Sequence, residues 1–132
     1  MDKVLVDTSA WIEFFRGKEP YRSAVERLID EDRVCCAGLV FGELLQRAKS
    51  TRELGTLKYF LHVFEFLEDS PSIWERAGEL ACSLRRKGRT VGLSDCYLAA
   101  AAVARGASIL TLDRHFRALK KEIPLRLTIP EA

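Results

Sequence analysis

VLVDTSAWIEFF, residues 4–15, joins a short apolar run to a helical pattern through a single aspartate. The apolar run is the end of a buried strand that we predict over residues 2–6. The apolar side chains that follow recur at helical spacing: Trp11, Ile12, Phe14 and Phe15. Ser9 is the expected N-cap of this helix, and Gly17 its end. A charge gains nothing at the tip of a buried strand, so the position of Asp7 suggests a chemical role.

Composition and charge are typical of a compact globular protein. The sequence has 132 residues, of which 48% are hydrophobic and 30% charged, a balance that disordered chains lack. We therefore expect a single domain over residues 1–132. The 21 basic and 19 acidic side chains leave a formal net charge of +2. The numbers of basic and acidic side chains are too similar for net charge alone to indicate a nucleic-acid-binding protein.

The N-terminus and the cysteines indicate the compartment. Residues 1–4 lack the basic and apolar regions of a signal peptide, and no apolar run approaches the roughly 18 residues of a membrane span. Cys35 and Cys36 are adjacent, while Cys82 and Cys96 lie in helical patterns without a C-x-x-C pair or a histidine at zinc spacing. We expect a cytoplasmic protein with reduced thiols, buried as small apolar side chains.

Short apolar runs alternate with helical patterns along the chain. The runs predict strands over residues 2–6, 33–37, 64–67, 108–112 and 125–128. The other patterns predict helices over residues 9–17, 20–32, 39–48, 52–63, 70–87, 95–106 and 114–121. Three of these helices have clear start signals, at Pro20, Ser70-Pro71 and Ser94. The alternation indicates an α/β fold with a parallel sheet covered on both faces, and such sheets bind ligands at the carboxyl ends of their strands.

Four acidic residues are predicted at that carboxyl edge. Asp7 and Asp113 each directly follow a strand. Asp95 lies in the first turn of the helix that leads into strand 108–112, and a helix that feeds a parallel strand starts over the carboxyl edge. Glu43 lies in the apolar helical segment LVFGELL, soon after the second strand.

Each of these acids also has a purely structural explanation. Asp7 and Asp95 can stabilise helix starts, and Asp113 can form an Asx turn. Glu43 can pair with Arg47 at i, i+4. Four carboxylates at one edge repel one another, however, and hard divalent cations relieve that repulsion. Without histidine or cysteine ligands, the set suits Mg²⁺ or Mn²⁺ rather than zinc, and it favours phosphodiester hydrolysis.

Two other acid-rich α/β architectures fit the sequence poorly. A phospho-accepting receiver domain needs paired acids after its first strand and a lysine after its fifth, and here Asp69 follows the third strand without them. A haloacid-dehalogenase-like phosphatase has two aspartates two residues apart after the first strand, where this chain has Asp7 and Ser9.

The motifs that carry the acids resemble, in order and spacing, those of PIN-domain ribonucleases. They are VLVDTSAWIEFF, LVFGELLQ, GLSDCYLAAAAVARG and ILTLDRHF, and the resemblance covers essentially the whole chain. It is greatest to the VapC toxins of VapBC toxin–antitoxin modules. It implies a PIN-like α/β/α sandwich with a five-stranded parallel sheet, and an Mg²⁺- or Mn²⁺-dependent endoribonuclease that cleaves RNA.

The resemblance also implies roles for individual residues. Asp7 and Asp95 match direct metal ligands. Glu43 matches a ligand that acts directly or through water, and Asp113 completes the acidic pocket. Hydroxyl-bearing residues that orient the acids or the water match Thr8, Ser9 and Thr111.

Basic residues lie near the acids in sequence. In the segments RRKGRTVG and DRHFRALKK, Arg89 and Arg114 are nearest to the acids, and we expect them to hold RNA phosphates. The basic residues at 85–87 suit a solvated helix end. We expect His115 to be structural or to face phosphate rather than to act in catalysis.

Large apolar side chains are concentrated in two of the predicted helices. Core packing explains most of them, and the remainder can form an exposed groove. The resemblance implies that a VapB-type antitoxin binds in such a groove and that the chain forms a homodimer. The residues assigned to the groove are Trp11, Phe15 and Phe60.

Three functions therefore stay open. The chain is a toxin endoribonuclease inhibited by an antitoxin, or a PIN nuclease of RNA processing or decay without an antitoxin, or a PIN-like module that binds RNA or protein without cleaving. The intact set of acids argues against the third.

Overall fold

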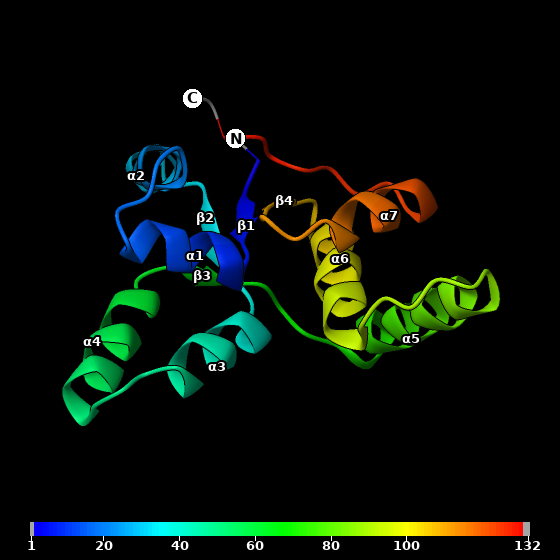
Figure 1. Ribbon diagram of the computed structural model, residues 1–132, viewed down its shortest axis with the longest axis horizontal. Helices are drawn as coiled ribbons and strands as arrows, with labels where there is room; N and C mark the ends of the chain where they lie inside the picture. The colour runs from blue at the N-terminus through cyan, green and yellow to red at the C-terminus, as the bar shows by residue number, and fades with distance from the viewer. Residues whose placement is uncertain (1, 131–132) are drawn as a thin grey trace.

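The computed structural model describes residues 2–130 and has a four-stranded parallel sheet at its centre (Figure 1). Its strands are β1 (Val4–Val6), β2 (Val34–Cys36), β3 (Glu65–Phe66) and β4 (Ser108–Leu110). They lie in the order β3-β2-β1-β4, and Leu5 aligns with Cys35 on one side and with Ile109 on the other. Every residue of β1, β2 and β4 is buried, which explains why these strands are almost entirely apolar.

In the described part of the chain, seven helices connect and cover the strands. They are α1 (Thr8–Phe15), α2 (Tyr21–Asp30), α3 (Gly38–Gln46), α4 (Thr51–Leu61), α5 (Pro71–Arg86), α6 (Leu93–Arg105) and α7 (His115–Glu122). In Figure 1, α1–α4 gather on the side of β2 and β3, whereas α5–α7 gather on the side of β4. The predicted α/β class with a parallel sheet is confirmed.

Two helix starts differ from the prediction, and both differences matter for function. The N-cap of α1 is Asp7, not Ser9, so the Ser9 hydroxyl is free to bond elsewhere. The N-cap of α6 is Gly92, not Ser94, and Asp95 still lies in the first turn of that helix. At α5 the predicted start is confirmed, because Ser70 accepts a hydrogen bond from the backbone N–H of Ile73.

Residues 125–128 do not form the predicted fifth strand. A single parallel bridge joins Leu127 to Ile109, held by backbone bonds of 3.0 and 2.8 Å that involve Arg126 and Thr128. The preceding chain is unsuited to longer pairing, because Pro124 has no N–H and the N–H of Leu125 turns back to Ile123. The prediction of five strands is therefore wrong by one.

The core contains three of the four cysteines. Cys35, Cys36 and Cys96 are buried, and burial raises the pKa of Cys35 and Cys36 to about 12, so these thiols stay protonated. All four cysteines are free, but Cys82 is exposed, contrary to prediction. Within residues 2–130, no helix has both the length and the apolar character to cross a membrane.

Candidate active site

The carboxylate of Asp7 lies at the carboxyl end of the central strand and is held by hydroxyl groups. It is only 7% exposed. Thr111, just after β4, donates a hydrogen bond to its Oδ2 at 2.7 Å, and Ser9 donates to the same oxygen at 3.2 Å. Ser9 and Thr111 also contact each other at 3.2 Å. The two hydroxyls thus fix Asp7 and connect the end of β1 to the loop that follows β4.

Thr8 connects Glu43 to the same region. Its Oγ1 donates a 2.8 Å hydrogen bond to Oε1 of Glu43, which is half-buried on α3. This bond directs the Glu43 carboxylate toward the start of α1 and not toward the alternative partner Arg47. The three hydroxyl-bearing residues singled out from the sequence therefore all bond to an acid or to one another.

Asp95, Asp113 and His115 form a group of possible metal ligands. One ligand atom from each lies within 4.8 Å of the others. The Nδ1 atom of His115 is 3.4 Å from Oδ2 of Asp95 and 3.2 Å from Oδ1 of Asp113. Asp113 also accepts the backbone N–H of His115 at 2.9 Å, which is the predicted Asx turn.

The contact of His115 with both acids was not foreseen from the sequence, and its expected structural or phosphate-facing role stays a prediction. The sequence places it two residues after Asp113, and the Asx turn folds it back over the acids. An Asp-x-His spacing directly after a buried strand was the available signal. It was weak because the direction of an exposed histidine depends on the turn and not on helix or strand periodicity.

Electrostatic repulsion is visible in the acids themselves. Burial, assisted by the charges of Asp113 and Asp7, raises the pKa of Asp95 to about 6, while His115 opposes the shift. Burial also raises the pKa of Asp7, against the bonds from Thr111 and Ser9 and with a further contribution from the charge of Asp113. The charge of Asp113 therefore disfavours the ionised forms of both Asp7 and Asp95.

This donor set fits a divalent cation. Carboxylate oxygens are the ligands that hard cations prefer, and a bound cation relieves the repulsion that raises these pKa values. The imidazole of His115 adds a nitrogen donor, which Mn²⁺ accepts more readily than Mg²⁺. The acidic cluster is thus able to hold a divalent metal ion.

Trp11, which the sequence analysis assigned to an exposed groove, is fully buried, and that assignment is wrong. Its ring centroid lies 5.6–5.7 Å from those of four phenylalanines: Phe14, Phe15, Phe60 and Phe64. Its Nε1 has no hydrogen-bond partner within residues 2–130. Trp11 is thus the centre of an aromatic cluster, because α4 packs over the face of α1 that carries it.

Phe15 and Phe60 do line a groove, of about 600 Å³, between α1, α3 and α4. Phe15 is 44% exposed, while Phe60 is half-buried. Other apolar lining residues are Ile12, Phe14, Leu44 and Leu57. The rim is mainly basic, from Arg16, Arg47 and Lys49, with Glu53 as its acid. The groove is therefore apolar inside and cationic at its edge.

The two arginines expected to bind phosphate lie in different settings. Arg114 is exposed and lines a hollow that also includes Asp113, so it borders the acidic cluster. Arg89 is exposed in the segment between α5 and α6, and its backbone N–H bonds to Leu84. Their contact with RNA stays a prediction.

Comparison with known proteins places this arrangement in a family. Residues 4–122 match the model of the PIN domain. Among curated proteins, ribonuclease VapC11 of Mycobacterium tuberculosis strain H37Rv and VapC ribonuclease Mb1587 of Mycobacterium bovis are each 31% identical to this chain over 118 residues. Each alignment covers 86% of this chain and 88% of the relative.

Solved structures show the same fold. A DNA-bound VapBC from Salmonella typhimurium has a TM-score of 0.75 and 26% identity, covering 97% of this chain and 98% of that one. A toxin–antitoxin complex from Klebsiella pneumoniae has a TM-score of 0.77 and 19% identity, with 98% of each chain covered. VapBC2 from Rickettsia felis, bound to a promoter DNA fragment, has a TM-score of 0.74 and 24% identity over 95% of this chain and 96% of that one.

Proposed function

This chain belongs to the PIN-domain family, among the VapC ribonucleases, and from that premise we propose that it is an Mg²⁺- or Mn²⁺-dependent endoribonuclease. The observation that carries the proposal is the convergence of Asp7, Asp95 and Asp113 at the carboxyl edge of the sheet, where burial and the charge of Asp113 raise the pKa of both Asp7 and Asp95. Repulsion between buried carboxylates does not stabilise the fold, whereas a metal-dependent hydrolase needs closely placed carboxylates to hold its cation.

The acids have distinct tasks in this proposal. Asp7 and Asp95 hold the metal directly, and Asp113 completes the acidic pocket with His115 beside it. Glu43 acts as a ligand directly or through water. When bound, the cation supplies positive charge for the scissile phosphate and favours ionisation of a water molecule near pH 7.

The hydroxyl groups position these acids. Thr111 and Ser9 both donate to Oδ2 of Asp7, which fixes the orientation of that carboxylate. Thr8 sets the direction of the Glu43 carboxylate. Because such supporting bonds fix the orientation of a ligand, their loss weakens metal binding even when every acid is present.

We further propose that the chain is the toxin of a type II toxin–antitoxin module, inhibited by a VapB-type antitoxin. Support comes from the VapC relatives and from the VapBC complexes among the structural neighbours. The apolar groove at Phe15 and Phe60 is suited to a partner segment with large apolar side chains, and its basic rim to acids on that segment. We also propose that the chain forms a homodimer and acts in the cytoplasm.

A cleavage assay tests the enzymatic part. The purified chain should cut RNA in the presence of Mg²⁺ or Mn²⁺ and not in EDTA. A chain that cuts no RNA with either ion contradicts the proposal and favours a non-catalytic PIN-like module.

Expression in cells tests the toxin part. Growth arrest by the chain alone, relieved by a partner from the neighbouring reading frame, is the expected result. RNA cleavage in vitro without growth arrest favours a nuclease of RNA processing or decay instead.

A further inference from the structure

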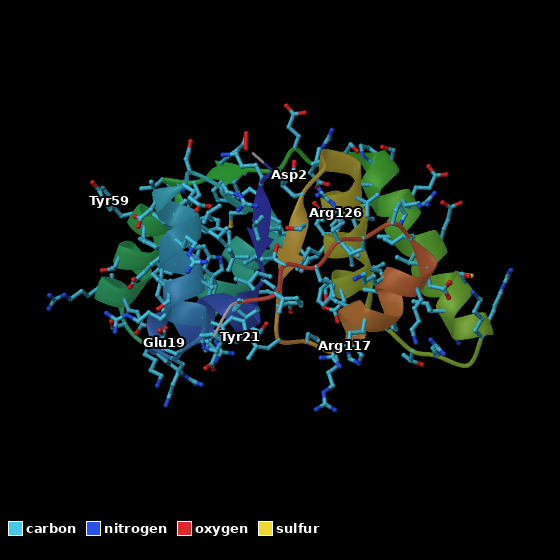
Figure 2. All side chains as sticks on the ribbon, turned by 90° about the horizontal axis from the view of Figure 1, so that it is seen from above. Asp2, Glu19, Tyr21, Tyr59, Arg117 and Arg126 are labelled. Carbon is cyan, nitrogen blue, oxygen red and sulfur yellow. The ribbon has the colours of Figure 1, made fainter. Side chains whose placement is uncertain are left out.

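A hollow of about 370 Å³ opens directly beside the acidic cluster, with which it shares Thr111 and Asp113. Tyr21 of α2 and Arg117 of α7 line it from two different helices. In Figure 2, Tyr21 and Arg117 lie toward one edge of the molecule, whereas Asp2 and Arg126, which form an ion pair at the start of β1, lie toward the other. The hollow thus lies at the carboxyl edge of the sheet, with the acids.

The walls of this hollow combine an apolar surface with two positive charges. Leu112 is 42% exposed and Ile129 is 77% exposed, although both are large apolar side chains. Arg114 and Arg117 stand one helical turn apart and are both exposed. A pocket of this size with an apolar wall and a few charged groups is typical of a site for one small ligand unit.

Among the described residues, the two arginines have no side-chain partner that explains their positions. They lie at the N-cap and in the first turn of α7, where the helix dipole disfavours positive charge. Within residues 2–130 neither guanidinium forms a hydrogen bond or an ion pair with another side chain. The nearest carboxylate in sequence, Asp113, is instead in contact with His115. Within residues 2–130, these two exposed charges therefore have no paired carboxylate, and an anionic ligand can approach them.

We propose that this hollow is a subsite for the nucleotide next to the scissile phosphate, an inference that rests on the proposed ribonuclease activity. The base lies against Tyr21, Leu112 and Ile129, and Arg114 and Arg117 hold the phosphate that follows. An RNA strand with its scissile phosphate at the acids must continue along one side of them, and the hollow borders Asp113. Bases contribute by stacking and apolar contact, and arginines by phosphate contact, so the subsite sets which nucleotide beside the cut is favoured.

Two variants test the subsite without touching the acids. Arg117→Gln removes the charge, and Ile129→Ala removes an exposed apolar contact. Each should raise KM for a short RNA cut by the wild type by about three- to tenfold and leave kcat within about twofold. The matched control is Arg52→Gln, because Arg52 is an exposed arginine in the first turn of α4, which is outside the hollow. It should leave both constants unchanged.

Abasic substrates locate the nucleotide. Single bases are removed in turn from the RNA on either side of the cut, and KM is measured in Mn²⁺ for the wild type and for Ile129→Ala. Removal of the base at one flanking position should raise KM for the wild type. The same removal should have little effect on KM for Ile129→Ala, because that variant already lacks the contact between the base and Ile129. If the wild type cuts RNA but removal of a base changes KM equally in the wild type and in Ile129→Ala at every position, the subsite is overturned while the ribonuclease proposal stands. If the wild type cuts no RNA, both fail.

Discussion

The two ends of α1 carry opposite chemistry although the helix has only eight residues. At its start, Thr8 and Ser9 donate hydrogen bonds to Glu43 and Asp7. At its end, Phe14 and Phe15 pack with other aromatic rings, around Trp11. One end belongs to a polar site with crowded charges and the other to an apolar cluster that continues into a groove.

The aromatic end of α1 serves mainly stability, whereas its polar end serves mainly the proposed activity. The polar end is held by hydroxyl bonds, yet burial and neighbouring acidic charges raise the pKa of Asp7 and Asp95, so their ionised forms oppose folding. The aromatic end is stabilised by burial, as a fully buried tryptophan indicates. Substitutions at the two ends should therefore have different effects, and four experiments sharpen or break the comparison.

The largest effect is expected from Asp95→Asn or Asp7→Asn. Loss of a carboxylate ligand should reduce cleavage by at least about 1,000-fold, because the metal supplies most of the charge stabilisation for the phosphate. Cleavage rates in Mg²⁺ and Mn²⁺ measure it. Asp30→Asn, at an exposed position at the end of α2, is the control and should cleave normally. Near wild-type cleavage by either site variant excludes that acid from the metal centre.

Trp11→Ala should produce the largest loss of stability. Removing the fully buried ring leaves a cavity among four phenylalanines and should lower the free energy of unfolding by about 3–5 kcal/mol. Urea denaturation measures it. Trp11→Phe should cost much less, because it keeps an aromatic ring and also removes the unbonded N–H. Equal losses in the two variants contradict the view of Trp11 as a packing residue.

Phe15→Ser should separate partner binding from catalysis. Phe15 is 44% exposed in the groove, so its loss should weaken binding of a cognate antitoxin by about 10- to 100-fold. RNA cleavage by the chain alone should not change. Tyr59→Ser is the matched control, because Tyr59 is an exposed aromatic residue of α4 outside the groove. Calorimetry with the purified partner measures both, and equal losses refute the groove as the binding site.

The smallest effect is a pH-dependent gain in stability in Asp95→Asn. The pKa of Asp95 is raised to about 6 in the folded chain, so the fold binds more protons than the unfolded chain between about pH 4 and 6. Stability from this group is therefore present at low pH and lost as the pH rises through 6. Asparagine stays neutral, so the variant should be more stable than the wild type by about 1 kcal/mol at pH 7.5, without metal.

At pH 3 that difference should largely vanish, since Asp95 is then mostly protonated in both the folded and the unfolded wild type. Denaturation in EDTA at the two pH values measures it. A gain of the same size at both pH values attributes the effect to packing or hydrogen bonding and not to charge.

Much of the architecture and part of the site could be predicted from the sequence. Strand and helix periodicity indicated the parallel α/β sheet, and chain order placed Asp7 and Asp113 at strand ends. Parallel strands share one carboxyl edge, so residues that directly follow them must lie on the same side of the molecule. For that reason acids far apart in the chain could be grouped without coordinates.

The predictions that proved wrong concern residues whose surroundings depend on how a second helix or strand packs against them. The burial of Trp11 depends on α4 covering that face of α1, and periodicity cannot tell which apolar residue of an amphipathic helix another helix will cover. The loss of the fifth strand depends on how residues 123–128 approach Ile109, and only one residue there has the geometry to pair.

Local pattern and chain direction suffice to predict the fold class and the order of the acids from the sequence. The contact of His115 with the acids, and the exposure of Arg114 and Arg117 to an open hollow, follow instead from how the elements pack together. Those arrangements depend on a turn after β4 and on the distance between α2 and α7. Contacts between side chains from separate elements have no periodic signature, and they are set only when the whole chain packs.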